Sequence, residues 1–360
     1  MTSIWTPIEV GGMHLPNRMA MAPMTRGRAL LDGTPSELAI DYYAQRAGLG
    51  LLITEGTQPS EDGQGYLNTP GIHTEAHVEA WRRISLAVDE AGGHIFIQLM
   101  HVGRMSHPAN TPHGRQPVAP SAVAPEVNIF TAAGPVPIPE PRAMTQQDIA
   151  TTIGDFAAAA RRAVEAGADG VEIHGANGYL LQQFIAPNAN LRNDEYGGSI
   201  ENRIRFTLEV TRAIVEAIGA ERTAIRLSPG MSLGGLDEGA EGPTLYRRLV
   251  TELDSLGLAY LHLVHIGDET LLTGLRKAWS GVLIVNRAGP GRERVGQDVA
   301  AGLADMESYG QMVLANPDFV ERIRSSAPLN VPDKTTFYGG GKAGYTDYPT
   351  LGSTEARLAS

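Results

Sequence analysis

Three residues that could act together on one small molecule lie close together in the segment DGVEIHGANGYLLQQF, residues 169–184. His174, Asn177 and Tyr179 follow a short apolar run, and Gly175 and Gly178 interrupt that run. His and Asn side chains can both donate hydrogen bonds to a single ligand oxygen, and a Tyr hydroxyl can donate a proton. These residue types and their spacing therefore predict a site that polarises and protonates an oxygen-bearing molecule.

The residues before this group read as a β-strand. Val171 and Ile173 alternate with Glu172 and His174, so the apolar pair lies on one face and the polar pair on the other. The three residues His174, Asn177 and Tyr179 therefore lie at the carboxyl end of that strand. In barrels of alternating strands and helices, polar residues at that end are typically catalytic.

The rest of the chain supplies the elements that such a barrel needs. Short apolar, β-branched runs predict strands at 18–22, 50–54, 94–99, 170–174, 223–227, 258–264, 282–285 and 305–309. Amphipathic windows predict helices at 36–47, 75–91, 145–166, 200–218, 244–256, 269–279 and 294–301. This alternation predicts an α/β fold, an eight-stranded parallel (β/α)8 TIM barrel that forms a single domain over residues 1–360.

An open α/β sheet with a dinucleotide fingerprint is the alternative fold. It requires a strand–GxGxxG–helix unit, which the sequence lacks. The nearest match, Gly289-Pro290-Gly291, has a proline in the tight turn.

Two segments interrupt the alternation of strands and helices. Residues 101–141 form a long Pro-, Gly- and Ala-rich stretch after the third strand, which predicts a lid or insertion over the site. Residues 328–360 carry aromatic side chains spaced by glycines, which suits a C-terminal tail that folds back over the barrel. An ordinary surface loop is the alternative for both segments.

Composition restricts the class of function. Acidic residues outnumber basic ones by 40 to 29, which gives a formal charge of −11 and argues against binding to nucleic acid or to an anionic membrane. The chain has no cysteine, which excludes disulfides, thiolate nucleophiles and iron–sulfur clusters. The first residues lack a signal-peptide pattern, and no apolar run approaches the roughly 20 residues that span a bilayer. We expect a cytoplasmic protein, monomeric or homodimeric.

Other strand ends deliver polar or small groups to the same rim of the predicted barrel. They are Pro23, Met24 and Thr25 after the first strand, Gly56 after the second, Gln98 in the third and Arg226 in the fifth. An inward arginine is costly unless an anion or an electron-rich ring accompanies it. This convergence predicts a flat, polar ligand at the barrel mouth.

Strands seven and eight are the expected place for a phosphate in such a barrel. Asn286 and Arg287 end the seventh strand, and Gly310 and Gln311 follow the eighth just before a helical segment. Backbone N–H groups there could hold a phosphate, and Arg287 could supply positive charge.

Metal and carboxylate chemistries are the competing interpretations. His73 with His77, and His262 with His265, have close spacings but no accompanying carboxylate pattern for zinc, so we expect no metal. For His262 and His265 we expect solvated or core-edge imidazoles. Glu55 and Glu172 could form a pair for glycoside cleavage. Ordinary ion pairing within the barrel is the interpretation we favour for them.

Four motifs together resemble the old yellow enzyme family, in its classical branch. They are HGANGYLLQQF at 174–184, YGGSIENRIRF at 196–206, APMTR at 22–26 and GYTDYP at 344–349. The likeness runs in consistent order from about residue 7 to residue 351. It implies a TIM barrel that binds FMN, oxidises NADPH or NADH, and reduces an electron-poor alkene such as an enone, enal, nitroalkene or maleimide.

The resemblance also implies a role for particular residues. Ala22, Pro23, Met24, Thr25, Gly56, Gln98, Arg226, Asn286, Arg287, Gly310 and Gln311 would hold FMN, with Thr25 at the flavin O4 and Arg226 near N1. His174 and Asn177 would bind the substrate oxygen, and Tyr179 would protonate the α-carbon. Tyr66, Met100, Phe337 and Tyr338 would line the substrate pocket with them. Thr25, in a chain without cysteine, fits the classical branch.

Two residues depart from the family pattern. Met100 stands where relatives often have Trp, so we expect a wider substrate pocket. Gln311 stands where many relatives have an arginine that binds the phosphate, so phosphate binding would depend on backbone N–H groups and on Arg287.

Three functions are therefore compared. An FMN-dependent ene-reductase is the leading one. A TIM-barrel hydrolase or lyase that uses carboxylates or a metal would be colourless. A flavin-binding protein without turnover is the third, and the intact His174, Asn177, Tyr179 and Thr25 argue against it.

Overall fold

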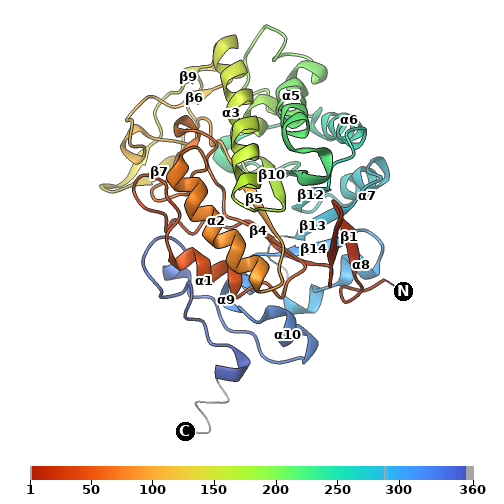
Figure 1. Ribbon diagram of the computed structural model, residues 1–360. Helices are drawn as coiled ribbons and strands as arrows, with labels where there is room; N and C mark the ends of the chain where they lie inside the picture. The colour runs from red at the N-terminus through yellow and green to blue at the C-terminus, as the bar shows by residue number, and fades with distance from the viewer. Residues whose placement is uncertain (1, 288, 290, 354–360) are drawn as a thin grey trace.

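The computed structural model describes residues 2–287, 289 and 291–353, and its centre is a closed barrel of eight parallel strands (Figure 1). The strands follow one another around the barrel in chain order: β3 (Met19–Met21), β4 (Leu51–Ile53), β5 (Ile95–Leu99), β10 (Gly170–Gly175), β11 (Thr223–Leu227), β12 (Tyr260–His265), β13 (Leu283–Arg287) and β14 (Met306–Tyr309). The predicted (β/α)8 barrel is confirmed. Pro290, which counted against a dinucleotide fingerprint, lies outside the described residues, as do residues 354–360 of the predicted tail.

Helices cover the outside of the barrel, as Figure 1 shows. They are α1 (Leu38–Ala44), α2 (Glu75–Glu90), α3 (Gln146–Glu165), α5 (Ile200–Ile218), α6 (Gly242–Asp254), α7 (Glu269–Ala278), α8 (Gln297–Ala300), α9 (Gln311–Ala315) and α10 (Phe319–Arg324). Local sequence explains where the long ones begin: Thr74, Thr145 and Ser199 each cap a helix by accepting a backbone N–H bond, and Thr145 forms a capping box with Asp148. All seven predicted helical windows contain a helix.

The amino-terminal end of the barrel is closed by apolar packing. A hairpin of β1 (Ile8–Val10) and β2 (Met13–Leu15) places Val10 and Leu15 against inward residues of the strands. That cluster is completed by Ala20, Leu51, Ile53, Phe96, Ala224, Ala259, Tyr260, Ile284 and Met306. Because this end is filled with hydrophobic side chains, a polar ligand must enter at the opposite, carboxyl end.

The insertion at 101–141 carries short elements and contacts the loops at the carboxyl end of the barrel. It contains β6 (Val118–Ala119) and a hairpin of β7 (Asn128–Thr131) and β8 (Gly134–Pro137). Just after the insertion, β9 (Arg142–Ala143) pairs with β6. Arg104 donates to the carbonyl of Gly234 at 2.9 Å, and Asn110 donates to the carbonyl of Gly65 at 3.0 Å. The segment therefore connects loops that follow different barrel strands.

The carboxyl-terminal tail is tied to the loop after β3. Arg26 donates to the carbonyls of Phe337 (2.9 Å) and Gly344 (2.8 Å), and Tyr345 stacks on Tyr42 with ring centroids 4.1 Å apart. Arg28 adds bonds to further tail carbonyls. The predicted fold-back of the tail is seen in the described residues, and two buried arginines hold it by charge-assisted bonds to backbone oxygens.

Candidate active site

The carboxyl end of β10 brings together the three residues of the opening motif. The amide nitrogen of Asn177 lies 3.5 Å from Nε2 of His174, and the rings of His174 and Tyr179 meet edge to face with centroids 5.0 Å apart. Nδ1 of His174 is buried and has no hydrogen-bond partner among the described residues. Thus Nε2 lies beside the Asn177 side-chain amide while Nδ1 has no partner, and an unpartnered buried polar atom leaves a place for a polar ligand.

The backbone after β10 is held in a special conformation. Asn177 has a left-handed φ of 57°, which asparagine tolerates better than most residues, and Gly178 follows with φ 83°. The N–H of Asn177 donates to Oγ of Ser228 at 2.9 Å, and the N–H of Gly178 donates to Oε1 of Gln182 at 2.7 Å. Ser228 and Gln182, from the β11 end and from α4 (Leu180–Ile185), thus fix the turn that aims Asn177 into the mouth.

Burial keeps the motif residues uncharged. Burial, together with the neighbouring Arg226 and His262, lowers the pKa of His174 well below its usual value. Burial and the neighbouring Tyr66 raise the pKa of Tyr179 well above its usual value. At neutral pH His174 therefore has one N–H and one lone pair, and Tyr179 retains its proton.

Tyr66 and the tail lie beside this group. The Tyr179 hydroxyl donates to the Tyr66 hydroxyl at 3.2 Å. Tyr338 adds to the raised pKa of both tyrosines, and its side chain is 73% exposed. Phe337 is partly buried and is held through its carbonyl by Arg26. The structure thus brings Tyr66 to the group of His174, Asn177 and Tyr179, with Tyr338 nearby at the surface.

The side chain of Met100 packs against the backbone of Gly56. Met100 is buried, and a Cβ on Gly56 would lie 2.4 Å from its sulfur, so a larger residue at position 56 would require the Met100 side chain to move. A role for Met100 in widening the substrate pocket stays a prediction.

A buried polar network lies beneath the mouth. Glu172 accepts from Nε2 of Gln98 at 2.7 Å and binds Nδ1 of His262 at 2.8 Å, and the opposite nitrogen of His262 lies 2.8 Å from Oγ of Ser308. Burial lowers the pKa of His262 to about 4. Burial acts to raise the pKa of Glu172, but His262, Arg226 and Gln98 outweigh it and lower that pKa.

This network contradicts the expectation that His262 is a solvated or core-edge imidazole, because its side chain is fully buried in the barrel. His262 and Ser308 are residues that the sequence interpretation missed. Their signal was strand parity: Tyr260 and His262 point the same way along β12, and Tyr260 lies in the inner apolar cluster.

Arg226 is a cation in contact with this network. Its NH1 lies 3.1 Å from Nε2 of His262, its NH2 donates to Oδ1 of Asn286 at 3.1 Å, and its Nε is buried without a partner among the described residues. Burial lowers its pKa to about 10, and Glu172 opposes that shift. A positive charge with a free N–H at the mouth suits an electron-rich ring or an anion.

Among the described residues, Glu55 binds backbone groups instead of forming the ion pair that we expected. Its Oε2 accepts from the backbone N–H groups of Arg26 and Gly27 at 2.9 and 3.0 Å, and burial raises its pKa. Neither it nor Glu172 presents a free carboxylate for glycoside cleavage.

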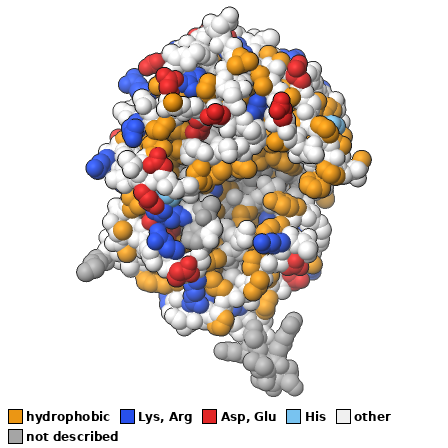
Figure 2. Space-filling model, turned by 180° about the vertical axis from the view of Figure 1, so that it is seen from behind, with side chains coloured by type: hydrophobic (Ala, Val, Ile, Leu, Met, Phe, Trp, Pro, Cys, Tyr) orange, Lys and Arg blue, Asp and Glu red, His pale blue; other side chains and the backbone are white. Residues whose placement is uncertain are grey.

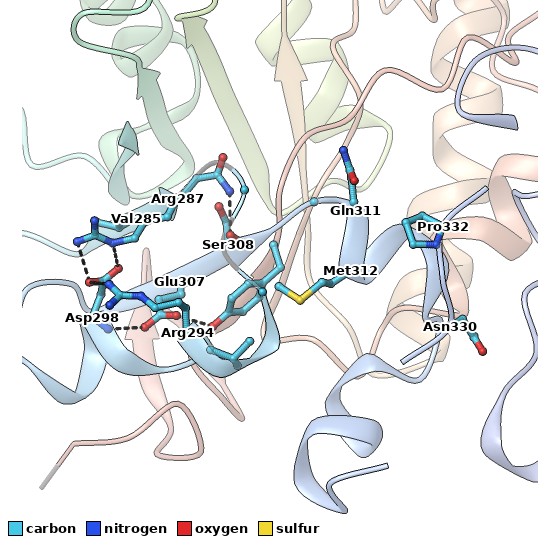
Figure 3. A pocket seen from close by; sticks show the side chains of 16 residues that line it. Val285, Arg287, Arg294, Asp298, Glu307, Ser308, Gln311, Met312, Asn330 and Pro332 are labelled. Atoms are coloured by element: carbon cyan, nitrogen blue, oxygen red, sulfur yellow. Dashed lines mark hydrogen bonds and ion pairs between the residues drawn. The ribbon is translucent and has the colours of Figure 1, made fainter. Parts of the chain in front are cut away.

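A cavity of about 470 Å³ opens at the ends of β13 and β14 (Figure 3). Its lining contains four residues predicted from sequence to hold a cofactor, namely Asn286, Arg287, Gly310 and Gln311. Arg287 forms four bonds to Glu269 and Asp298, at 2.6 to 3.1 Å, and these bonds raise its pKa. A direct role for Arg287 on phosphate stays a prediction, and its N–H groups already have partners.

In the remaining histidine pair, the ring of His77 contacts backbone atoms. Nδ1 of His77 accepts from the N–H of His73 at 3.3 Å, and Nε2 of His77 lies 3.0 Å from the carbonyl of Asp32. Within the described part of the chain, no three His, Cys, Asp or Glu side chains gather as metal ligands would. No helix there is long and apolar enough to cross a membrane.

The molecular surface agrees with the charge balance. Figure 2 shows acidic and basic side chains interspersed over one face, with hydrophobic side chains around its middle.

Comparison with known proteins gives one consistent answer. A family model described as NADH:flavin oxidoreductase / NADH oxidase matches residues 3–330. A probable flavin mononucleotide-dependent alkene reductase of Leishmania infantum is 42% identical over 357 residues, 96% of each chain.

Solved structures agree with the sequence matches. Morphinone reductase in complex with tetrahydroNAD superposes with a TM-score of 0.93 at 43% identity, covering 98% of both chains. The old yellow enzyme homologue from Zymomonas mobilis superposes with a TM-score of 0.93 at 40% identity, covering 97% of this chain and all of that one. The chain is an oxidoreductase that belongs to the NADH:flavin oxidoreductase / NADH oxidase family, which includes the old yellow enzymes.

Proposed function

We propose that this oxidoreductase is an FMN-dependent ene-reductase, which uses NADPH or NADH to reduce an electron-poor alkene such as an enone, enal, nitroalkene or maleimide. The observation that carries this proposal is the group at the end of β10. There, Nε2 of His174 lies 3.5 Å from the Asn177 side-chain amide, and the His174 ring, whose Nδ1 has no partner among the described residues, meets the Tyr179 ring edge to face. The three donors occupy one rim of a barrel whose other end is closed by apolar packing.

The residues at the mouth fit the cofactor. Arg226 has a buried Nε with no partner in the described chain, as expected of a cation that faces the electron-rich pole of a flavin ring. Gln98 is oriented by its bond to Glu172. Pro23, Met24 and Thr25 are partly exposed at the end of β3, where they would border the ring.

Bound FMN would supply the redox chemistry, by accepting a hydride from NADPH or NADH and passing one to the β-carbon of the alkene. His174 and Asn177 would donate hydrogen bonds to the carbonyl or nitro oxygen and so draw electron density from the double bond. Tyr179, whose raised pKa keeps it protonated, would give its proton to the α-carbon.

The rest of the chain would shield this chemistry. We propose one barrel domain in which residues 101–141 cover the mouth and the tail from 328 onward brings Phe337 and Tyr338 to the substrate side. Tyr66 would position the Tyr179 hydroxyl through their 3.2 Å hydrogen bond. A cytoplasmic location, and a monomer or homodimer that binds no nucleic acid, complete the proposal.

The visible spectrum of the purified protein under anaerobic conditions tests this function. Flavin absorbance that bleaches with NADPH and returns on addition of 2-cyclohexenone would support both half-reactions. A protein that cannot be loaded with FMN would overturn the proposal. Bleaching that no activated alkene reverses would limit the protein to oxidising NADPH.

A further inference from the structure

The cavity at the ends of β13 and β14 contains two arginines in very different situations. Arg287 and Arg294 both line it, together with the carboxylates of Asp298 and Glu307. The side chain of Arg287 is 15% exposed and that of Arg294 is 43% exposed. An anion in this cavity needs N–H donors that are not already bonded within the protein.

Arg287 is occupied by its own carboxylate partners. Its Nε and NH2 bind Asp298 at 2.6 and 3.0 Å, and its NH1 and NH2 bind Glu269 at 2.6 and 3.1 Å. In Figure 3 dashed lines join its guanidinium to Asp298, while the Gln311 side chain projects away from this pair. A ligand would have to displace two carboxylates to reach Arg287.

Both carboxylates in the lining have partners. Asp298 is held by Arg287. Glu307 accepts from the N–H groups of Gly296, Asp298 and Val299 at 2.8 to 3.1 Å and from the Tyr309 hydroxyl at 2.6 Å. Their repulsion of a bound anion is therefore reduced, and the remaining cation of the lining is the one that can meet such an anion.

Arg294 is that remaining cation among the described lining residues. Its one ion pair is a loose contact of 4.0 Å to Asp298. It lies in the short turn η5 (Arg292–Arg294), which is anchored because Arg292 donates to the carbonyls of Ala327 and Arg322. A turn held by Arg292 thus presents the half-exposed guanidinium of Arg294 to the cavity.

We propose that Arg294 binds the terminal phosphate of FMN in this chain, and that Arg287 acts as a positioning residue that holds Asp298. This inference rests on the proposed function. In this assignment, Arg294, which follows β13, supplies the positive charge that binds the phosphate. Gln311 at the end of β14 is neutral, and Arg287 is already paired with two carboxylates. Backbone N–H groups near Gly310 would add uncharged donors.

Flavin binding to the apoprotein tests the assignment without relying on activity. Dissociation constants for FMN and for riboflavin, which lacks the phosphate, are measured by quenching of flavin fluorescence for the wild type, Arg294→Ala and Arg294→Lys. Arg248→Ala, which removes one exposed charge on α6, is the matched control.

Arg294→Ala should raise the dissociation constant for FMN about ten- to a hundredfold, as for a lost charge-assisted hydrogen bond, and leave that for riboflavin unchanged. Arg294→Lys should recover part of the loss, and added salt should weaken FMN binding less in Arg294→Ala than in the wild type.

Three results would overturn the assignment. An unchanged FMN constant in Arg294→Ala would exclude the contact. An equal loss for FMN and riboflavin would indicate a structural role. A higher KM for NADPH with unchanged FMN binding would assign Arg294 to a phosphate of the nicotinamide donor. If the wild type binds neither flavin, the proposed function itself fails, which is a different pattern from all three.

Discussion

The mouth at the carboxyl end of the barrel has two parts that are built in different ways, called the first and second ends of the mouth. At the end of β10, His174, Asn177 and Tyr179 lie within six residues of sequence, and one turn held by Ser228 and Gln182 sets their geometry. At the ends of β13 and β14, the charged groups come from separate segments, and their pairing decides which of them is free. Function at the first end follows from local spacing, whereas function at the second depends on tertiary ion pairing.

Among the variants at the first end of the mouth, Tyr179→Phe should cause the largest loss in the rate of alkene reduction. Removal of the hydroxyl should lower the rate of alkene reduction about 10²- to 10⁴-fold, the usual contribution of a general acid, because the α-carbon loses its proton source. Stopped-flow absorbance under anaerobic conditions measures each half-reaction separately. Reduction by NADPH, which needs no proton from Tyr179, is the internal control.

Alkene reduction at the wild-type rate in Tyr179→Phe would remove Tyr179 from the mechanism. Tyr66→Phe is the matched variant, since it keeps the acid and removes only the 3.2 Å hydrogen bond to it. We expect a much smaller loss there.

His174→Ala tests substrate polarisation. Loss of one oxyanion-type donor should reduce kcat/KM for the alkene about 10²- to 10³-fold. The variant should still bind flavin, which is checked by its visible spectrum. If kcat/KM falls only slightly, Asn177 alone would be sufficient to polarise the substrate.

The sequence was most informative where local patterns determine structure. Short apolar, β-branched runs located the strands, amphipathic windows located the helices, and the polar rim followed from strand ends. His262 was misjudged because it was paired with His265. Three residues apart on a strand, the two side chains point to opposite faces, and only His262 reaches the barrel interior.

The state of Arg287 could not be read from sequence for a different reason. Its partners lie 18 and 11 residues away, on α7 and α8, and only the folded barrel brings Glu269 and Asp298 to the end of β13. Composition and spacing indicate a cation near a phosphate site, but they do not reveal whether its N–H groups are already bonded.

Gln311→Arg tests the second end of the mouth, because it adds a positive charge beside the cavity. A guanidinium beside the cavity should lower the dissociation constant for FMN about tenfold, the value of one added charge-assisted hydrogen bond, with no change for riboflavin. Fluorescence quenching measures both constants. Gln311→Met, which changes the side chain without adding charge, is the control, and tighter FMN binding by that variant as well would argue against an electrostatic cause.

The smallest expected effects concern pH, and they should differ between the two ends. The pKa of His174 is lowered well below its usual value and that of Tyr179 is raised well above, so neither group titrates between pH 6 and 8. The rate of alkene reduction by the reduced enzyme should therefore be nearly flat there. A bell-shaped profile centred in this window would mean that one of the two is not shielded as the structure indicates.

FMN binding should instead vary with pH, because a phosphate monoester loses its second proton near pH 6. The dianion is attracted to a free arginine more strongly than the monoanion, so affinity should rise severalfold from pH 5.5 to 7.5 and then level off. Riboflavin, measured in parallel, reports any titration of the protein itself. Equal pH dependence for both flavins would place the titrating group on the protein and remove the contrast between the two ends of the mouth.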